Sequence, residues 1–275
     1  MRSRLQSEVS TSTLVAVPAK ANRDFVDPGS IVRRIWGDPD LVLLIFAGSA
    51  AEFALNRAVD WLFFTGKIPQ DPIGRLFSTV RYAQEIVFVD EETAMRTLGR
   101  INAQHGLVEE QRGQTIPDWA FRDVLYMLID YSERSYSLLY KPLSKNQKRE
   151  LYDAFSRIGH GLSIPNLPRS YEEWEGDRRE HMVRDLVFSK HTSMLFRQYR
   201  RHLGMWRYQL LLQVQAVLVP DEVRRLLKFN SGKLMSGLAQ VYGTITGGNV
   251  RSLVHSLLIP PRYWSEVRSF DRIGR

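Results

Sequence analysis

Apolar residues recur every three or four positions along most of this 275-residue chain, which is the spacing of one buried face of an α-helix. The alternating pattern typical of strands is scarce, since Leu14–Val17 and Val87–Val89 are short and have no pairing partner in the sequence. Neither a βαβ rhythm nor a repeat of about 20–50 residues is present. The pattern predicts an all-α fold: an irregular multi-helix bundle, globin-like in its packing style, that forms a single domain.

Local capping signals indicate where several of these helices begin. Asp90 is followed by two glutamates, which is typical of an N-cap with acids in the first turn, so we expect a helix from Glu91 to about Val108. A long helix is expected over Asp118–Lys141, after a polar loop. Two further helices should begin at the capping boxes Ser144-x-x-Gln147 and Ser170-x-x-Glu173.

The same pattern sets the expected boundaries of the domain. Residues 1–24 are rich in Ser, Thr, Ala and Lys without a clear period, and we expect a flexible tail there. Residues 25–262 are expected to form the helical domain, followed by a C-terminal tail over residues 263–275. Nothing in the sequence between these tails indicates a second domain.

The segment Leu41–Phe64 is the most hydrophobic part of the chain, yet it contains Glu52, Arg57 and Asp60. Because a membrane span tolerates such charges badly, we expect a pair of buried helices instead. Either acid could be buried with a raised pKa, but we favour ion pairs with Arg57. With no signal-peptide pattern at the N-terminus, we expect a cytoplasmic protein that can associate with a membrane.

Composition limits the chemistry. The chain has no cysteine, which excludes disulfides, thiolate-ligated haem, iron–sulfur clusters and a cysteine nucleophile. Its net charge of +8 fits a solvated basic surface, attraction to an anionic membrane, or, least well, nucleic-acid binding, which we do not expect. The basic residues cluster with aromatic and apolar neighbours in one place: Arg197, Arg200, Arg201, His202 and Arg207.

Several common active-site motifs are absent from the sequence. We find no phosphate-binding P-loop, no dinucleotide fingerprint and no G-x-S-x-G nucleophile elbow. No two histidines are three or four residues apart, as they are in many zinc sites. Hydrolase, NTPase and dehydrogenase functions therefore have no support.

Arg75, Thr79 and His105 carry the most informative chemistry. Arg75 and Thr79 are four residues apart, so they share one face of a helix. His105 falls on an apolar helical stripe and is followed by Gly106, which would let a flat ligand approach closely. An inward-facing Arg, hydroxyl and imidazole would suit an acidic planar cofactor, although each could instead be an ordinary core or surface residue.

These residues also occur within an ordered series of short motifs. The series resembles the latex-clearing-protein (rubber oxygenase) and MpaB-type oxygenase family, and the resemblance extends from about Phe25 to Pro261. In chain order, the motifs are Asp27-Pro-Gly-Ser30, Gly37-Asp38, Asp71-Pro-x-Gly-Arg-x-x-x-Thr79, Val87-Phe88, His105, Pro142-Leu-Ser144, Gly159 and Pro165.

The resemblance implies an all-helical oxygenase that binds haem b and uses dioxygen to cleave double bonds in apolar chains. It implies that His105 is the iron ligand, while Arg75 and Thr79 line the haem pocket and take part in catalysis. We therefore expect an apolar, unsaturated substrate of isoprenoid or lipid-like type. Its pocket should be lined by helices around Leu41–Phe64, Val124–Leu139 and Leu210–Val219.

The sequence also departs from the family pattern. Many relatives have histidines where this chain has Leu55 and Leu125. This favours a second hypothesis, a non-catalytic helical binding module that keeps the family fold, with a basic peripheral membrane adaptor as a third. The family aspartate is present as Asp130, for which we expect a structural role such as holding an arginine.

Overall fold

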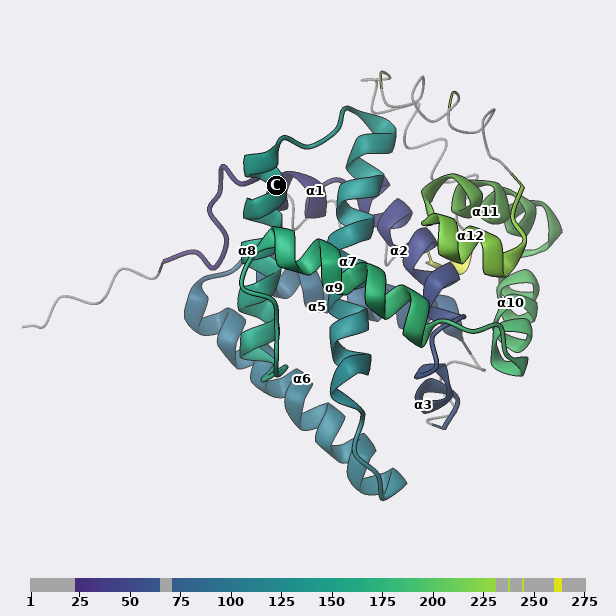
Figure 1. The fold of residues 1–275 in the computed structure, drawn as a ribbon, viewed down its shortest axis with the longest axis horizontal. Coiled ribbons are helices and arrows are strands. Elements are labelled where there is room, and N and C mark those ends of the chain that lie inside the picture. The colour runs from purple at the N-terminus through teal and green to yellow at the C-terminus, as the bar shows by residue number, and fades with distance from the viewer. Residues whose placement is uncertain (1–22, 65–70, 231–236, 238–243, 245–259, 264–275) are drawn as a thin grey trace, which may run out of the picture.

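The computed structural model describes residues 23–64, 71–230, 237, 244 and 260–263, and helices dominate these residues (Figure 1). The helices, in chain order, are α1 (Ile31–Trp36), α2 (Pro39–Phe53), α3 (Val59–Phe64), α5 (Pro72–Val87), α6 (Glu91–Arg112), α7 (Asp118–Leu139), α8 (Lys145–Gly161), α9 (Tyr171–Asp185), α10 (Lys190–Leu203), α11 (Met205–Leu218), α12 (Asp221–Leu227) and the 3₁₀ turn η1 (Pro261–Tyr263). No strand occurs in these residues, which confirms the predicted all-α fold.

The expected helix starts are confirmed, because their capping contacts are local. The side chain of Asp90 accepts a hydrogen bond from Thr93 N at the start of α6. Ser144 and Gln147 form a complete capping box before α8. Ser170 accepts from Glu173 N before α9.

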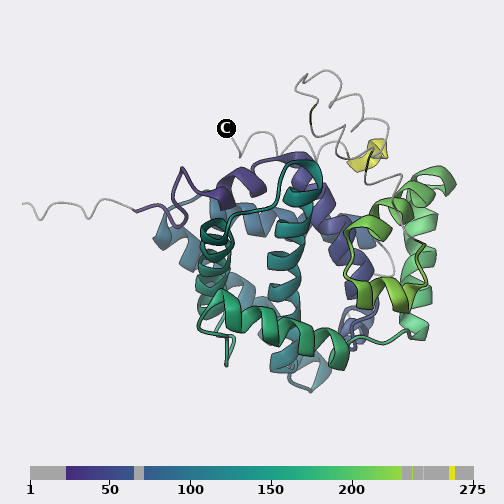
Figure 2. The ribbon, with the colours of Figure 1, turned by 45° about the horizontal axis from the view of Figure 1, so that its top comes forward.

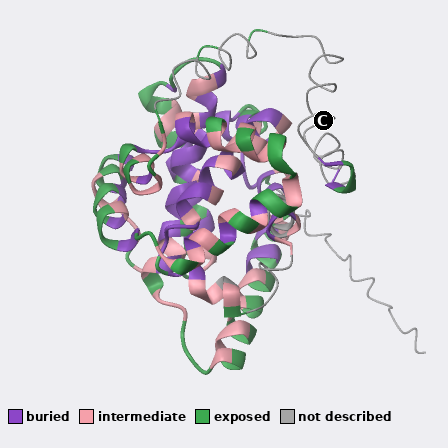
Figure 3. Cartoon of the chain, turned by 90° about the vertical axis from the view of Figure 1, so that its right-hand side faces the viewer, coloured by how far each residue is buried: buried purple, intermediate pink, exposed green. Residues whose placement is uncertain are grey.

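The centre of the molecule is the contact between α2 and α7, the most extensive between any two described helices. Gly48 of α2 allows the close approach, since a Cβ at this position would lie 2.3 Å from ring carbons of Tyr131 on α7. Buried residues gather along these inner helices, and exposed residues lie around them (Figure 3). The core therefore depends on a backbone-to-ring contact as well as on large apolar side chains.

Two helical groups flank this centre. The helices α5 and α6 pack against each other on one side. On another side, α10, α11 and α12 form an edge of the molecule, which both ribbon views show at the right (Figures 1 and 2). The globin-like packing style stays a prediction, since the described contacts do not establish it.

The apolar segment Leu41–Phe64 forms two helices. Most of its residues in α2 are buried, and α3 follows after a short turn. The predicted ion pairs with Arg57 are wrong. Glu52 pairs instead with Arg178 of α9, and Asp60 pairs with Arg112 of α6. Both true partners are distant in the sequence, so the nearest cation along the chain was a poor guide.

Among the described residues, no helix has the length and apolar character needed to cross a membrane. The predicted tails, residues 1–24 and 263–275, lie almost entirely outside the described residues, as does the strand-like run at residues 14–17. Val87–Val89 ends α5 and leads into α6 without forming a strand.

Candidate functional site

The pair of helices α5 and α6 carries all three predicted site residues. Asp71 caps α5 by accepting from Gly74 N at 2.9 Å. Arg100 of α6 donates to Glu85 at 3.3 Å, and Gln104 donates to the Tyr82 hydroxyl at 3.2 Å. These side-chain bonds fix the two helices side by side along the stretch that contains Thr79 and His105.

His105 lies half-buried on α6, between that helix and α7. Its ring centroid is 5.0 Å from that of Phe121, with the planes inclined by 48°. Gly106 is exposed, and a Cβ built there would meet nothing within 4 Å, so this position of α6 faces open space at the surface. A half-buried imidazole against a phenyl ring, followed by a position without a side chain, suits ligation of a planar cofactor through His105.

The structure describes Arg75 and Thr79 less fully than His105. Thr79 is exposed on α5, and the side chain of Arg75 lies outside the described residues. The roles of Arg75, Thr79 and His105 in catalysis and cofactor binding therefore stay predictions. What the structure does establish is that their backbones belong to two helices that pack together.

An apolar pocket of about 200 Å³ lies among α2, α10, α11 and the first turn of α5. Its walls include Leu44 and Ala47 of α2 and Leu211 and Val214 of α11, together with Ile73 of α5. The predicted lining segments Leu41–Phe64 and Leu210–Val219 thus both contribute.

The third predicted segment, Val124–Leu139, contributes none of the residues that line this pocket, although its helix α7 packs extensively against α2. The first turn of α5 lines the pocket, and Arg75 is only two residues beyond Ile73. The helix α5 therefore joins the apolar pocket to the motif residues, and Thr79 lies about 10 Å along the helix from Pro72.

A polar group adjoins the pocket, which Tyr263 helps to line. The hydroxyl of Tyr263 donates to Asp71 Oδ1 at 2.6 Å, and His202 Nδ1 lies 3.7 Å from the same oxygen. Burial by itself would raise the pKa of Asp71, but the hydrogen bonds from Tyr263 and from Gly74 N hold it below its usual value. Asp71 therefore stays ionised and fixes both η1 and the start of α5.

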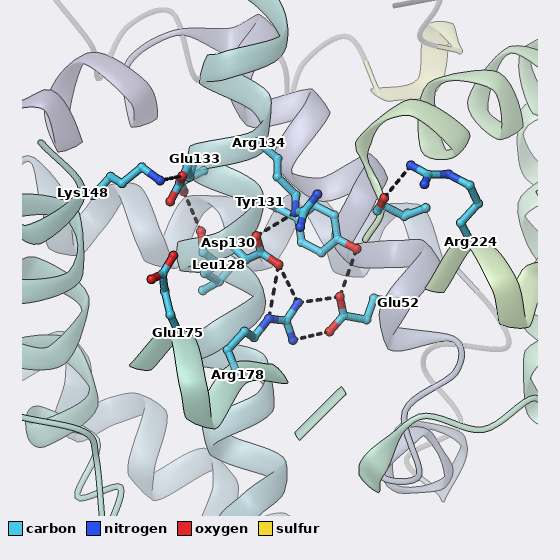
Figure 4. A network of polar contacts seen from close by, with 12 residues as sticks. Glu52, Leu128, Asp130, Tyr131, Glu133, Arg134, Lys148, Glu175, Arg178 and Arg224 are labelled. Atoms are coloured by element: carbon cyan, nitrogen blue, oxygen red, sulfur yellow. Dashed lines mark hydrogen bonds and ion pairs between the residues drawn. The ribbon is translucent and has the colours of Figure 1, made fainter. Parts of the chain in front are cut away.

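A buried ionic network connects α2, α7 and α9 (Figure 4). The guanidinium of Arg178 donates two hydrogen bonds to Glu52, at 2.6 and 2.7 Å, and another to Asp130 at 3.0 Å. Tyr131 donates to Glu52 at 3.0 Å, and Arg134 donates to Asp130 at 2.7 Å. The predicted structural role of Asp130 in holding an arginine is confirmed.

The charges in this network shift the acidity of its members. Burial alone would raise the pKa of Asp130, but the cations of Arg178 and Arg134 hold it below its usual value. Burial and the nearby carboxylate of Glu52 raise the pKa of Tyr131 well above its usual value. Each charged group is thus compensated by a partner, which favours a structural function.

A second buried cluster lies close to the first and was not predicted. The ligand atoms of Asp123, His181 and Asp185 all lie within 4.8 Å of one another, so these residues could hold a metal ion. However, His181 Nδ1 contacts Asp123 directly, and Asn56 Nδ2 donates to the same carboxylate at 2.6 Å. Arg184 donates twice to Asp185. Hydrogen bonds thus already satisfy the cluster, which joins α7, α9 and the turn between α2 and α3.

A signal for this cluster was present in the sequence. Asp177, His181 and Asp185 are spaced four residues apart and so share one face of α9. Searching only for pairs of histidines missed this pattern. The contribution of Asp123 could not have been found by spacing, since it comes from α7.

The two positions where relatives have histidine are part of the core here. Leu55 is fully buried in the turn after α2, and Leu125 is buried in α7. The methyl groups of Leu125 would lie 2.7 Å from a Cβ at Gly159, so this side chain is tightly packed against α8. Leu55 and Leu125 therefore cannot perform any role that depends on histidine at these positions.

Comparison with known proteins agrees with the ordered motifs. Residues 33–245 match the model of the family described as ER-bound oxygenase mpaB/B'/Rubber oxygenase, catalytic domain. No individual curated protein showed a significant match. The match includes every helix from α2 to α12, and with it Arg75, Thr79 and His105. The chain belongs to the MpaB and rubber oxygenase family, whose matched region is an oxygenase catalytic domain.

Proposed function

We propose that this protein is a haem b-dependent oxygenase that acts with dioxygen on an apolar, unsaturated molecule of isoprenoid or lipid-like type. The observation that carries the proposal is the position of His105, half-buried beside Phe121 and followed by the exposed Gly106, within a chain of the oxygenase family. A neutral imidazole in such a place is a suitable axial ligand for haem iron.

In this proposal each motif residue has a separate task. His105 would ligate the iron through a ring nitrogen and hold the cofactor on α6. Arg75 would neutralise a propionate, and the Thr79 hydroxyl would donate a hydrogen bond to the cofactor. Haem supplies the dioxygen chemistry when it is bound, whereas the protein supplies the axial ligand, the polarity of the pocket and the access path.

The apolar pocket beside the first turn of α5 is the proposed substrate site. Its walls are almost wholly aliphatic or aromatic, which excludes water and favours a narrow hydrocarbon chain. Because α5 continues from this pocket to Arg75 and Thr79, the proposed substrate site and the proposed haem site share this helix. We place the protein in the cytoplasm, in peripheral contact with the membranes in which such substrates dissolve.

A non-catalytic binding module is the second candidate function. It is favoured by Leu55 and Leu125, which fill positions of family histidines with packed core side chains. This candidate retains the fold and the apolar pocket but does not bind haem. The two functions therefore differ in one property that can be measured directly.

The test is a visible absorption spectrum of the purified protein, before and after incubation with haemin. A Soret band with about one haem per chain supports the oxygenase, and a protein that stays colourless supports the binding module. The loaded protein is then incubated with unsaturated terpenoids and lipids, with and without dioxygen. Oxygen-dependent carbonyl or hydroxylated products support the proposed reaction, and equal turnover without dioxygen would contradict it.

A further inference from the structure

The segment between Asp185 and Asp221 has an unusual charge pattern. It contains no acidic residue, although acidic residues are spread through the rest of the described helices. It does contain basic residues, all of them on or beside α10 and α11: Lys190, Arg197, Arg200, Arg201 and Arg207. This concentration of positive charge lies at one edge of the molecule (Figures 1 and 2).

The helix α10 divides into two distinct faces. Thr192, Leu195 and Tyr199 are buried against the protein. The opposite side is exposed, and its residues are spaced by four, three and four positions, as expected for a single stripe. We call this stripe the basic face of α10, and it consists of Lys190, Met194, Arg197 and Arg201.

The two arginines of the basic face lack the acidic partner that several other exposed arginines have. Arg96, Arg149 and Arg225 are exposed, and each forms an ion pair with a glutamate. In the part of the chain that the structure describes, Arg197 and Arg201 form no ion pair. Their charge is therefore available to an external anionic partner.

Large apolar side chains are exposed at both ends of α10. Phe188 is 53% exposed just before the helix, and Met205 and Trp206 are 59% and 46% exposed just after it. The guanidinium of Arg207 lies over the Trp206 ring, 4.4 Å from its centroid. Exposed Phe and Trp next to Arg and Lys are typical of proteins that insert side chains into the headgroup region of a bilayer.

We propose that the basic face of α10, with Phe188, Met205 and Trp206 at its ends, is a docking surface for a membrane that carries anionic lipids. The charge pattern selects the anionic surface, and the apolar ends favour a bilayer over a nucleic acid. The docking surface borders the apolar pocket, because Leu203 and Arg207 line that pocket. The purpose of this docking, to bring a lipid-dissolved substrate to the pocket, rests on the proposed function. The docking itself does not.

The test is co-sedimentation of the full chain with phosphatidylcholine vesicles, with and without phosphatidylserine, at low and at physiological salt. We expect binding only to the vesicles that contain phosphatidylserine. In the variant Arg197→Gln/Arg201→Gln, binding should weaken about thirtyfold, since each basic residue near an anionic surface contributes about a factor of five. The matched control is Arg96→Gln/Arg225→Gln, which removes the same charge from ion-paired, exposed positions and should bind as the wild type does.

The variant Phe188→Ala/Trp206→Ala should lose most of the binding that remains at physiological salt, because apolar insertion is not screened by ions. Equal losses in the control variant, or equal binding to both kinds of vesicle, would overturn the proposal. So would tighter binding of a DNA oligonucleotide that is lost in Arg197→Gln/Arg201→Gln. None of these measurements needs haem or turnover, so failure here is distinguishable from failure of the oxygenase proposal.

Discussion

His105 and His181 lie on helices of the same domain, but their surroundings differ. His181 is almost fully buried and contacts the carboxylate of Asp123, with Asp185 3.4 Å away. His105 is half-buried against a phenyl ring and is followed by the exposed Gly106, where a Cβ would meet nothing within 4 Å. The comparison teaches that burial and local space, more than residue type, separate a histidine that maintains the fold from one that can accept a ligand.

The same contrast holds for the regions around them. The polar networks of α2, α7 and α9 consist of charges that compensate one another, so they stabilise one arrangement of the helices. The α5–α6 region instead keeps Thr79 exposed and His105 half-buried. If this comparison is right, substitutions in the first region should change stability, and substitutions in the second should change cofactor binding.

The largest expected effect is that of Arg178→Ala. It would leave Glu52 and Asp130 as buried carboxylates without their main cation, which should lower the free energy of unfolding by about 3–5 kcal/mol. The matched control is Arg149→Ala, which removes an exposed pair with Glu172 and should cost about 0–1 kcal/mol. Urea unfolding measures both, and equal losses would contradict a special role for the buried network.

Acid should weaken the same network. Because Arg178 and Arg134 lower the pKa of Asp130 in the folded protein, its ionised form contributes stability above its unfolded pKa of about 3.9. That contribution is lost as the pH falls through the lower, folded pKa. Urea unfolding from neutral to acidic pH should therefore show a fall below about pH 4 that is smaller in Asp130→Asn. A variant with the same pH dependence as the wild type would contradict this.

Gly48→Ala should be the next most damaging substitution. The added methyl group would lie 2.3 Å from the ring of Tyr131, so α2 and α7 would have to separate. Overpacking of this kind typically costs about 1–3 kcal/mol. Thermal unfolding of the purified variant measures the loss. A wild-type midpoint would show that the contact between α2 and α7 can relax without cost.

Gly106→Ala should have the opposite effect on stability and still harm function. Its methyl group meets nothing within 4 Å, so the variant should gain up to about 1 kcal/mol from improved helix propensity. If a haem edge approaches over Gly106, haem affinity should fall nonetheless. Gly176→Ala in α9 is the matched control, since it also meets nothing within 4 Å and should leave haem affinity unchanged. Equal haem affinity in both variants would place the cofactor elsewhere.

These contrasts also explain how much the sequence could predict. Helix starts at Asp90, Ser144 and Ser170 were predictable, because a capping contact involves residues three positions apart. The partner of Glu52 was not predictable, because Arg178 is 126 positions away and only the fold brings the two together. A contact between residues so far apart in the sequence leaves no local spacing pattern from which it could be predicted.

The candidate site follows the same rule. The order of the motifs was enough to identify the family, which the match over residues 33–245 confirms. The spacing of Arg75 and Thr79 correctly placed them on one helix. The proximity of α7 to His105 through Phe121 depends on tertiary packing and had no signal in the sequence.

The most direct test of the central claim is haem binding by His105→Ala, compared with His160→Ala as the matched control. His160 is an exposed histidine on α8, so its variant controls for non-specific ligation of haem by a surface imidazole. Haem content after reconstitution is measured with the pyridine haemochrome assay, together with the Soret spectrum. We expect His105→Ala to lose most of its haem, and His160→Ala to keep the wild-type content and spectrum. Wild-type haem content and an unchanged spectrum in His105→Ala would contradict the central claim.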